Sequence, residues 1–499
     1  MIALALCLAV APQELVRATA RDLPEGLRLT DATVGDVDGD GLEDLVLGCA
    51  SEGAGAGAVL VLRGVREGGF AQALRLDLTP DVVAWALGDV HPDAGREVVL
   101  FGAASVFAWR PRASEAERFV RLSACSFLWQ LPEENGAFLY APGVRDVDGD
   151  GLEDLVCPEP GGYTVALQRR GAEGASFEAR RLEVPREVEQ GFGPGGEGTR
   201  TLEVRLDSGE GEEDVLPGAL LSLSDSLPAP QWVDWDADGR LDLVAQGSRA
   251  LHLWPRAAAG APAASFALPV VADRERRLDA SYRAFSQDLD RDGRADVAIF
   301  AGDNRSSDVR TQVLIFTSGG AGGGAPRDPF GEKGVPRDLI VLAGFVASAE
   351  FVDLDGDGYP ELVAHTVRPD LIDAMRSAAS ETFESELFVY RNERGRFARK
   401  PGLSWRYTVP IKQFVPRIEF VADASGDGLA ELFARIEPTR VRLHLLRATP
   451  QGWTVVERPL WEGGLAAEAR LRALPAAEGR PRGLVAIEKR RVTHFGVGR

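Results

Sequence analysis

Residues 36–47 read DVDGDGLEDLVL, and residues 146–157 repeat nearly the same string as DVDGDGLEDLVC. Four related segments follow: DWDADGRLDLVA from Asp234, DLDRDGRADVAI from Asp288, DLDGDGYPELVA from Asp353 and DASGDGLAELFA from Asp423. A short motif that recurs along a chain is the sequence signature of an architecture built from similar units packed side by side. We therefore expect a repeat protein.

Two further segments keep the frame of the motif in altered form. DVHPDAGREVVL from Asp89 has His91 where most copies have an acid and Ala94 where the others have glycine. A last and shorter copy, GLVAIE, lies at residues 483–488. The sequence thus contains eight units, or seven if the last copy is only a loop.

Each unit continues from its acidic motif in the same way. An apolar run follows directly, then a second run such as VLVLRG near Val59, and then two more alternating stretches that lead to the next motif. Alternating polarity, β-branched and aromatic residues and Gly/Pro punctuation predict strands. Four strands in a unit of roughly 60 residues are typical of a propeller blade. The sequence therefore predicts an all-β fold, a β-propeller of eight four-stranded blades, with seven blades as the alternative.

The two ends of the chain are expected to close the ring. The last unit stops at Arg499 after its second predicted strand, and two strand-like stretches precede the first motif, at Glu14–Arg21 and Leu27–Val34. Both stretches would complete the last blade by pairing the N-terminal with the C-terminal strands, which removes an open sheet edge.

We expect residues 12–499 to form one propeller domain with two insertions. The first, at about residues 186–226, is rich in glycine and acid, and the second lies at residues 369–383. In the second, Leu371, Ile372, Met375 and Ala379 are spaced like one face of a short helix. Long loops are where propellers usually place binding surface, and a disordered surface loop is the alternative for the acidic insertion.

Charge and hydropathy exclude several classes of protein. The formal charge of −20, from 56 basic and 76 acidic residues, argues against nucleic acid or an anionic membrane surface as a partner. The longest apolar run, Met1–Ala11, is too short for a transmembrane helix. Residues 1–11 instead have the apolar core and A-x-A-like end of a signal peptide, although without a basic start, and a buried first strand is the alternative. We expect a secreted, periplasmic or cell-surface protein.

Cysteines give little information about the compartment. Cys7, Cys49, Cys125 and Cys157 include no CxxC pair, so neither a zinc ribbon nor a thioredoxin-type site is indicated. Removal of Cys7 with a signal peptide would leave three, which allow one disulfide at most.

The repeated acidic motif predicts metal sites. Carboxylates at positions one, three, five and nine, with glycine at six, converge on one centre and suit Ca²⁺, which takes six to eight oxygen ligands in flexible geometry. Six sites, and so five or six Ca²⁺ ions, are expected. The first three use Asp36, Asp38, Asp40, the Leu42 carbonyl and Asp44; Asp146, Asp148, Asp150, the Leu152 carbonyl and Asp154; and Asp234, Asp236, Asp238, the Arg240 carbonyl and Asp242. The last three use Asp288, Asp290, Asp292, the Arg294 carbonyl and Asp296; Asp353, Asp355, Asp357, the Tyr359 carbonyl and Glu361; and, more poorly, Asp423, Ser425, Asp427, the Leu429 carbonyl and Glu431.

Two other interpretations of the motif were weighed. An EF-hand needs a bidentate glutamate at position twelve and flanking helices; position twelve is Leu47 in the first copy and acidic in none. Turns rich in aspartate can also form without metal. Three or four carboxylates on nine residues repel one another unless a cation neutralises them, which favours the metal.

The set D-x-D-x-D-G-x-x-[DE]-L-V, repeated at blade spacing, resembles the FG-GAP or VCBS repeats of integrin α-subunit propellers and many secreted bacterial proteins. The resemblance implies a propeller stiffened by Ca²⁺, used for adhesion or ligand recognition, with metal loops on the face away from the usual binding surface. The literal Phe-Gly and Gly-Ala-Pro signatures are mostly absent. The second and last units lack metal ligands, so we expect those blades to pack without an ion.

No catalytic motif stands out, and the leading hypothesis is a non-enzymatic binding or adhesion module for an extracellular protein or polysaccharide. The histidines are spread over five units, and His252, His444 and His494 fall within predicted strands, as structural residues do. The alternative is an extracellular Ca²⁺-dependent polysaccharide lyase or hydrolase with an Arg/Lys/His/Tyr cluster in a central groove. Only Arg406 and Tyr407, between Lys400 and Lys412, hint at such a cluster. A scaffold with a large exposed apolar patch is a third hypothesis.

Overall fold

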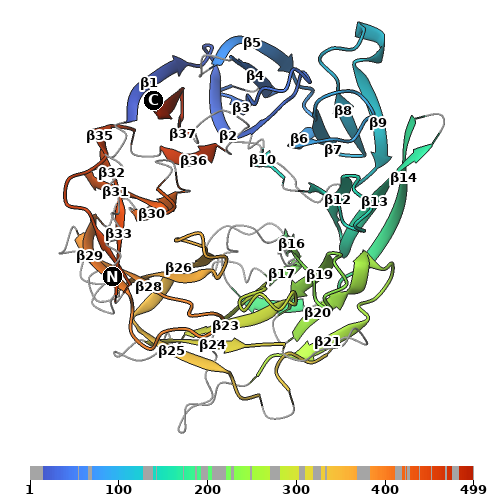
Figure 1. Ribbon diagram of the computed structural model, residues 1–499. Coiled ribbons are helices and arrows are strands. Elements are labelled where there is room, and N and C mark those ends of the chain that lie inside the picture. Colours follow the sequence, from blue (N-terminus) through green and yellow to red (C-terminus); the bar gives the residue numbers. More distant parts are fainter. Residues whose placement is uncertain are drawn as a thin grey trace, which may run out of the picture.

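In the computed structural model each acidic motif joins two antiparallel strands of one sheet, and eight such sheets surround a central axis as the blades of a propeller (Figure 1). The structure describes residues 15–53, 56–65, 70–126, 139–141, 143–171, 174–185, 188–192, 200–204, 221–225, 230–247, 250–269, 281–302, 310–318, 327–331, 334–367, 382–410, 418–421, 423, 427–437, 439–450, 452–466, 469–474 and 483–497. The expected signal peptide at residues 1–11 and the short helix proposed after residue 369 lie outside these ranges.

The strands of blades 1 to 4 are given from the innermost to the outermost. Blade 1 contains β2 (Leu27–Gly35), β3 (Asp44–Ser51), β4 (Ala58–Gly64) and β5 (Phe70–Asp77). Blade 2 contains β6 (Val82–Gly88), β7 (Glu97–Gly102), β8 (Ser105–Trp109) and β9 (Phe119–Ala124). Blade 3 contains β11 (Val144–Arg145), β12 (Asp154–Glu159), β13 (Gly162–Gly171) and β14 (Gly174–Glu183). Blade 4 contains β18 (Pro230–Val233), β19 (Asp242–Gln246), β20 (Ala250–Trp254) and β21 (Ala264–Ala267).

Blades 5 to 8 follow the same order. Blade 5 contains β22 (Ser281–Gln287), β23 (Asp296–Gly302), β24 (Arg310–Phe316) and β25 (Asp338–Ala343). Blade 6 contains β26 (Phe345–Val352), β27 (Glu361–Val367), β28 (Thr382–Tyr390) and β29 (Leu403–Pro410). Blade 7 contains β30 (Ile418–Val421), β31 (Glu431–Glu437), β32 (Arg440–His444) and β35 (Trp461–Gly464). Blade 8 contains β36 (Arg470–Leu474), β37 (Gly483–Glu488), β38 (Arg491–Val497) and β1 (Leu15–Asp22).

The count of eight blades and the closure by both chain ends are confirmed, but the share of each end in the last blade differs from the prediction. Only β1 joins blade 8, where it pairs antiparallel with β38 as the outermost strand. The second N-terminal stretch forms β2, the inner strand of blade 1, because it directly precedes the first acidic loop as the inner strand does in the later blades. The remaining place is filled by β36, which the sequence analysis missed.

Several elements are added to the repeating plan. Strand β10 (Leu139–Tyr140) extends blade 2 by parallel pairing with β6, and a hairpin of β33 (Leu446–Thr449) and β34 (Gly452–Val455) interrupts blade 7. The first insertion is not a plain loop: β15 (Val188–Phe192), β16 (Arg200–Val204) and β17 (Leu221–Asp225) form a three-stranded sheet within it. Two short 3-10 helices, η1 (Glu115–Glu117) and η2 (Pro255–Ala257), follow the third strands of blades 2 and 4.

Hydrophobic packing between neighbouring blades holds the ring together. Each of eight buried apolar clusters draws its side chains from two adjacent blades, and the cluster that includes Leu47 and Val485 joins blade 1 to blade 8. The second strand of a blade is covered on both faces, which explains why the acidic motif runs into an unbroken apolar stretch: every residue of β23 and β27 is buried. No helix in the described ranges is long and apolar enough to cross a membrane.

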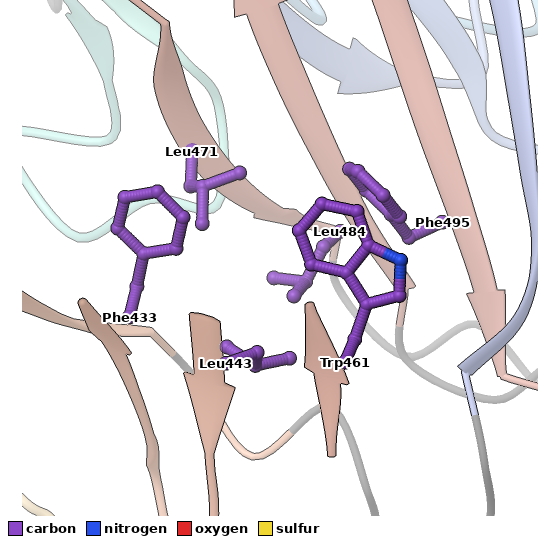
Figure 2. Close-up of a pocket in the computed structure, with 6 residues that line it drawn as sticks. All are labelled: Phe433, Leu443, Trp461, Leu471, Leu484 and Phe495. Carbon is purple, nitrogen blue, oxygen red and sulfur yellow. The ribbon is translucent and has the colours of Figure 1, made fainter. Parts of the chain in front are cut away.

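Figure 2 shows the contact between blades 7 and 8, where six apolar side chains from six strands surround a small gap. The rings of Trp461 and Phe495 meet edge to face there, with centroids 4.8 Å apart. The gap is lined by Phe433, Leu443, Trp461, Leu471, Leu484 and Phe495. It is part of the interblade core.

Removal of β1 tests the closure of the ring. A chain that starts at residue 24 loses the strand that covers the edge of β38, so we expect its thermal unfolding midpoint to fall by roughly 5–10 °C. A chain that starts at residue 13 keeps β1 and serves as the control. Equal melting temperatures of the two chains, followed by circular dichroism, would contradict the closure.

Candidate metal centres

The acidic loops all join the innermost strand of a blade to its second strand. The innermost strands all run in the same direction along the propeller axis. The loops that follow them therefore lie on one face of the propeller. We number each loop by its blade, and its positions from one to nine: residues 36–44, 89–97, 146–154, 234–242, 288–296, 353–361 and 423–431 for blades 1 to 7. In blade 8 the segment between β36 and β37, residues 475–482, lies outside the described residues, and its sequence does not contain the motif.

The turn of the loop depends on two backbone positions with positive φ. In loop 1 these are Gly39 at position four, with φ of 66°, and Gly41 at position six, with φ of 80°. Glycine adopts this left-handed region without the steric cost that a Cβ atom brings. Ala237 and Arg291 stand at position four of loops 4 and 5 and still have φ of 60°. The tight turn is therefore kept even where the glycine is not.

Carboxylates at positions one and five fold the loop onto itself. In loop 1, Asp36 Oδ2 accepts the N–H of Gly41 at 2.8 Å, and Asp40 Oδ1 accepts the N–H of Leu42 at 2.8 Å. The second bond recurs in all six predicted sites, so the position-seven residues expected to offer a carbonyl are each tied to their loop, namely Leu42, Leu152, Arg240, Arg294, Tyr359 and Leu429. The aspartates are thus turn formers as well as candidate ligands.

The carboxylate at position nine is buried and bridges three parts of its blade. Asp296 is the first residue of β23 and has no exposed surface. Its Oδ2 accepts the N–H of Leu289 at 3.1 Å in the loop, and its Oδ1 accepts the N–H of Ser318 at 2.9 Å after the third strand. Corresponding pairs of bonds are made by Asp44, Asp154, Asp242 and Glu361.

Burial makes the charged form of these carboxylates costly. Desolvation, with the nearby loop aspartates adding to it, raises the pKa of Asp296 to about 7 and that of Glu361 to about 8. The pKa values of Asp154 and Asp242 rise to about 6 for the same reason. A cation beside these groups would favour the ionised form and oppose this shift.

Backbone hydrogen bonds join three pairs of neighbouring loops. The N–H of Arg96 at position eight of loop 2 donates to the carbonyl of Asp36 in loop 1 at 2.7 Å. Ala295 in loop 5 makes the same bond to Asp234 in loop 4 at 2.8 Å, and Ala430 in loop 7 donates to the carbonyl of Leu354 in loop 6 at 2.9 Å. Position eight therefore links loops 1 and 2, 4 and 5, and 6 and 7.

The predicted ligands converge as the motif requires. Three-residue groups with candidate ligand atoms within 4.8 Å of one another occur in loops 1, 3, 4 and 5, and the groups are Asp36, Asp38 and Asp40; Asp146, Asp148 and Asp154; Asp234, Asp236 and Asp242; and Asp288, Asp290 and Asp296. Ser425 lies outside the described residues. Among the residues of loop 7 that are described, Asp423, Asp427 and Glu431 keep the motif, and Glu431 is completely buried.

Two oxygens in these clusters are buried without a hydrogen-bond partner: Oδ1 of Asp148 in loop 3 and Oδ1 of Asp355 in loop 6. Both belong to position three, which the motif assigns to the metal. A buried carboxylate oxygen without a partner is costly, and a divalent cation bound by several carboxylates would satisfy it. The donor set is all oxygen, so the residues fit Ca²⁺.

Arginine side chains approach the same carboxylates, which the sequence analysis did not foresee. Arg169 contacts Asp148 and Asp150 at 2.8 and 2.9 Å, and Arg63 contacts Asp38 at 2.6 Å. Similar pairs in loops 4, 5 and 6 are Arg256 with Asp238, Arg337 with Asp290, and Arg391 with Asp355. The sequence signal was the arginine that closes the second apolar run of most units.

Loop 2, whose blade we expect to pack without an ion, brings together a different set of polar side chains. His91, Asp93 and Glu97 lie within 4.8 Å of one another, and Asp93 pairs with Arg110. The buried Glu97 accepts the N–H groups of Val90 and His91 at 3.0 and 3.1 Å. The altered loop therefore keeps the buried carboxylate at position nine, but its residue with positive φ is Gly95 at position seven, with φ of 102°, and not the residues at positions four and six.

A comparison with family models agrees with the repeats. Residues 288–364, which span loops 5 and 6, match the sequence model of the FG-GAP-like repeat. A comparison with curated proteins gave no match. Solved structures similar to this chain include a rhamnogalacturonan lyase from Bacillus licheniformis (11% identity, 97% of this chain and 72% of that one, TM-score 0.42).

Two other similar structures are Sqt1 from Chaetomium thermophilum (13% identity, 98% of this chain and 100% of that one, TM-score 0.44) and a lectin from Agrocybe aegerita that recognises terminal N-acetylglucosamine (15% identity, 76% and 85%, TM-score 0.37). These likenesses are too distant to bear on activity. The repeated loops and the eight closed blades make the chain a β-propeller, and its residues 288–364 match the FG-GAP-like repeat.

Proposed function

We propose that this chain is an exported, calcium-binding propeller that serves as a binding or adhesion module for an extracellular protein or polysaccharide. The observation that carries the calcium part is the pair of buried, unpartnered oxygens of Asp148 and Asp355, each within a loop of converging carboxylates. The six predicted sites use 23 of the chain's 76 acidic residues as ligands. Bound Ca²⁺ would neutralise this band of charge on one face of the ring.

Calcium suits these loops better than the other common divalent ions. All side-chain ligands in loops 1 and 3 to 6 are carboxylates, which disfavours Zn²⁺ with its preference for nitrogen and sulfur. Mg²⁺ demands a strict octahedron and keeps several waters, whereas Ca²⁺ accepts the irregular cluster that a tight turn offers.

The positions of Arg406 and Tyr407, the residues that suggested a catalytic cluster, favour a binding module over an enzyme. Arg406 pairs with Glu386 at 3.3 Å, and the Tyr407 hydroxyl contacts His365 Nδ1 at 3.0 Å. Both Arg406 and Tyr407 lie on β29, the outermost strand of blade 6, and not at the central axis, where the lyase or hydrolase alternative would place its groove. Their contacts are those of side chains that fix a sheet.

Thermal unfolding with and without calcium tests the proposal. We expect the melting temperature of the full chain to rise by roughly 5 °C or more in millimolar Ca²⁺ over the value in chelator, because a ligand that binds only the folded state stabilises it. Metal analysis of the same sample is expected to give five or six bound ions. No bound calcium and no shift would mean that the aspartates only form turns.

Two substitutions in loop 5 separate the ligand role from the architectural one. Asp296→Asn leaves one of two buried N–H groups without an acceptor, so we expect a loss of about 1–3 kcal/mol in unfolding free energy even in chelator. Asp292→Asn keeps the oxygen that accepts the Arg294 N–H, at 2.9 Å in the native loop, and removes one of several like charges. It should cost less than about 0.5 kcal/mol in chelator.

In Ca²⁺ we expect Asp292→Asn to lose more unfolding free energy than in chelator, because it then also loses part of the calcium-dependent stabilisation. Urea unfolding in both conditions measures the two effects. A loss of equal size for Asp292→Asn with and without calcium would argue against a ligand role for position five.

A further inference from the structure

Two cysteines meet where blade 2 packs against blade 3. Cys125 directly follows β9, the outermost strand of blade 2, and Cys157 lies on β12, the second strand of blade 3. Their exposed fractions are 4% and 1%, and both belong to the apolar cluster that joins the two blades. The Cys125 side chain, together with burial, raises the pKa of the Cys157 thiol, as expected of neighbouring side chains in one cluster.

A separate hydrogen bond holds the segment of Cys125 close to the strand of Cys157. The N–H of Ser126, next to Cys125, donates to Oε1 of Glu159, two residues after Cys157, at 2.8 Å. Glu159 is held in turn by Arg181 at 2.6 Å and by the Thr164 hydroxyl at 2.7 Å. The segment that carries Cys125 is thus anchored to the strand that carries Cys157 by more than the sulfur atoms.

We propose that Cys125 and Cys157 form a disulfide that links blade 2 to blade 3 when the protein folds in the presence of a disulfide oxidant. One thiolate attacks the oxidant, a small-molecule or protein disulfide, and forms a mixed disulfide; the second thiolate then attacks that bond. The two cysteines lose two electrons and two protons, one S–S bond forms, and the oxidant leaves as two thiols. Because both sulfurs are buried, the reaction belongs to folding or to a local opening of the interface.

The third described cysteine provides an internal control. Cys49 lies on β3 in the cluster that joins blade 1 to blade 8, and it is completely buried. Desolvation raises the pKa of its thiol to about 12, and burial raises the pKa of Cys157 too, so what sets Cys49 apart is that its cluster contains no second cysteine. Cys49 should remain a thiol under conditions that oxidise the pair.

The cross-link would close a loop that contains β10 and β11, the strands through which the chain passes from blade 2 to blade 3. A disulfide that closes a loop of this size restricts the unfolded chain and so stabilises the folded one. It would staple an interface otherwise held by apolar packing. The proposal is independent of calcium binding.

Oxidative refolding of the full chain tests the proposal. The protein is refolded from denaturant with a mixture of oxidised and reduced glutathione, its free thiols are then blocked with N-ethylmaleimide in denaturant so that buried thiols react, and its peptides are mapped by mass spectrometry. We expect a peptide linked through Cys125 and Cys157, with Cys49 alkylated. The melting temperature should exceed that of the dithiothreitol-treated protein by roughly 3–10 °C.

Three variants complete the experiment. Cys125→Ala and Cys157→Ala should lose both the linked peptide and the reductant-sensitive shift, whereas Cys49→Ala should keep both. Should either pair variant fail to fold, the peptide map of the native chain alone decides. Full alkylation of a correctly refolded native protein, or a cross-link through Cys7 or Cys49, would overturn the proposal.

Discussion

The buried carboxylate at position nine of each acidic loop is the interaction on which the blade depends. It is the first residue of the second strand, and it holds the start of the loop and the turn after the third strand through two backbone N–H groups. Loop 2 shows that this role does not require the rest of the acidic motif. His91 and Ala94 replace a ligand and the turn glycine there, yet Glu97 still accepts the N–H of Val90. The position is kept where the rest of the motif has changed.

The loops also join neighbouring blades. Their hydrogen bonds define the position of one blade against another more specifically than apolar packing alone. Apolar clusters fill all eight interfaces, but hydrophobic contact is non-directional and permits sliding. The hydrogen bonds from Arg96 to Asp36 and from Ala295 to Asp234 have a defined direction and length. They fix how blade 2 sits against blade 1, and blade 5 against blade 4, on the loop face. A motif known by its carboxylates thus also sets the geometry of the ring.

The fold could be predicted from the sequence because the acidic motif and the alternating strands indicated the same four-stranded unit. The strands that the prediction missed depend on contacts between distant segments. The four-strand count followed from alternation, and the acidic frame located even the eroded strand at residues 483–488. Strand β36 reads RLRAL, and only its pairing with β37 marks it as a strand. The β33–β34 hairpin had no signal in the repeat pattern that would separate it from the outer strand of blade 7.

The arginine contacts were hidden for the same reason, and they alter the chemistry expected of the loops. Arg169 lies 19 residues from Asp150 and pairs with it at 2.9 Å, so the spacing of the acidic motif could not reveal it. A guanidinium that already neutralises two carboxylates removes much of their mutual repulsion.

The ring therefore has a means of remaining folded without a divalent ion. Calcium would not enter an empty anionic cage; it would exchange with a positive charge held on a long, half-exposed side chain. Arg63 and Arg256 are 41% and 53% exposed, so water can take over their solvation when they leave. The net gain from calcium is then the difference between two neutralised states of one loop. That difference is largest where an oxygen still has no partner, as in Asp148 and Asp355.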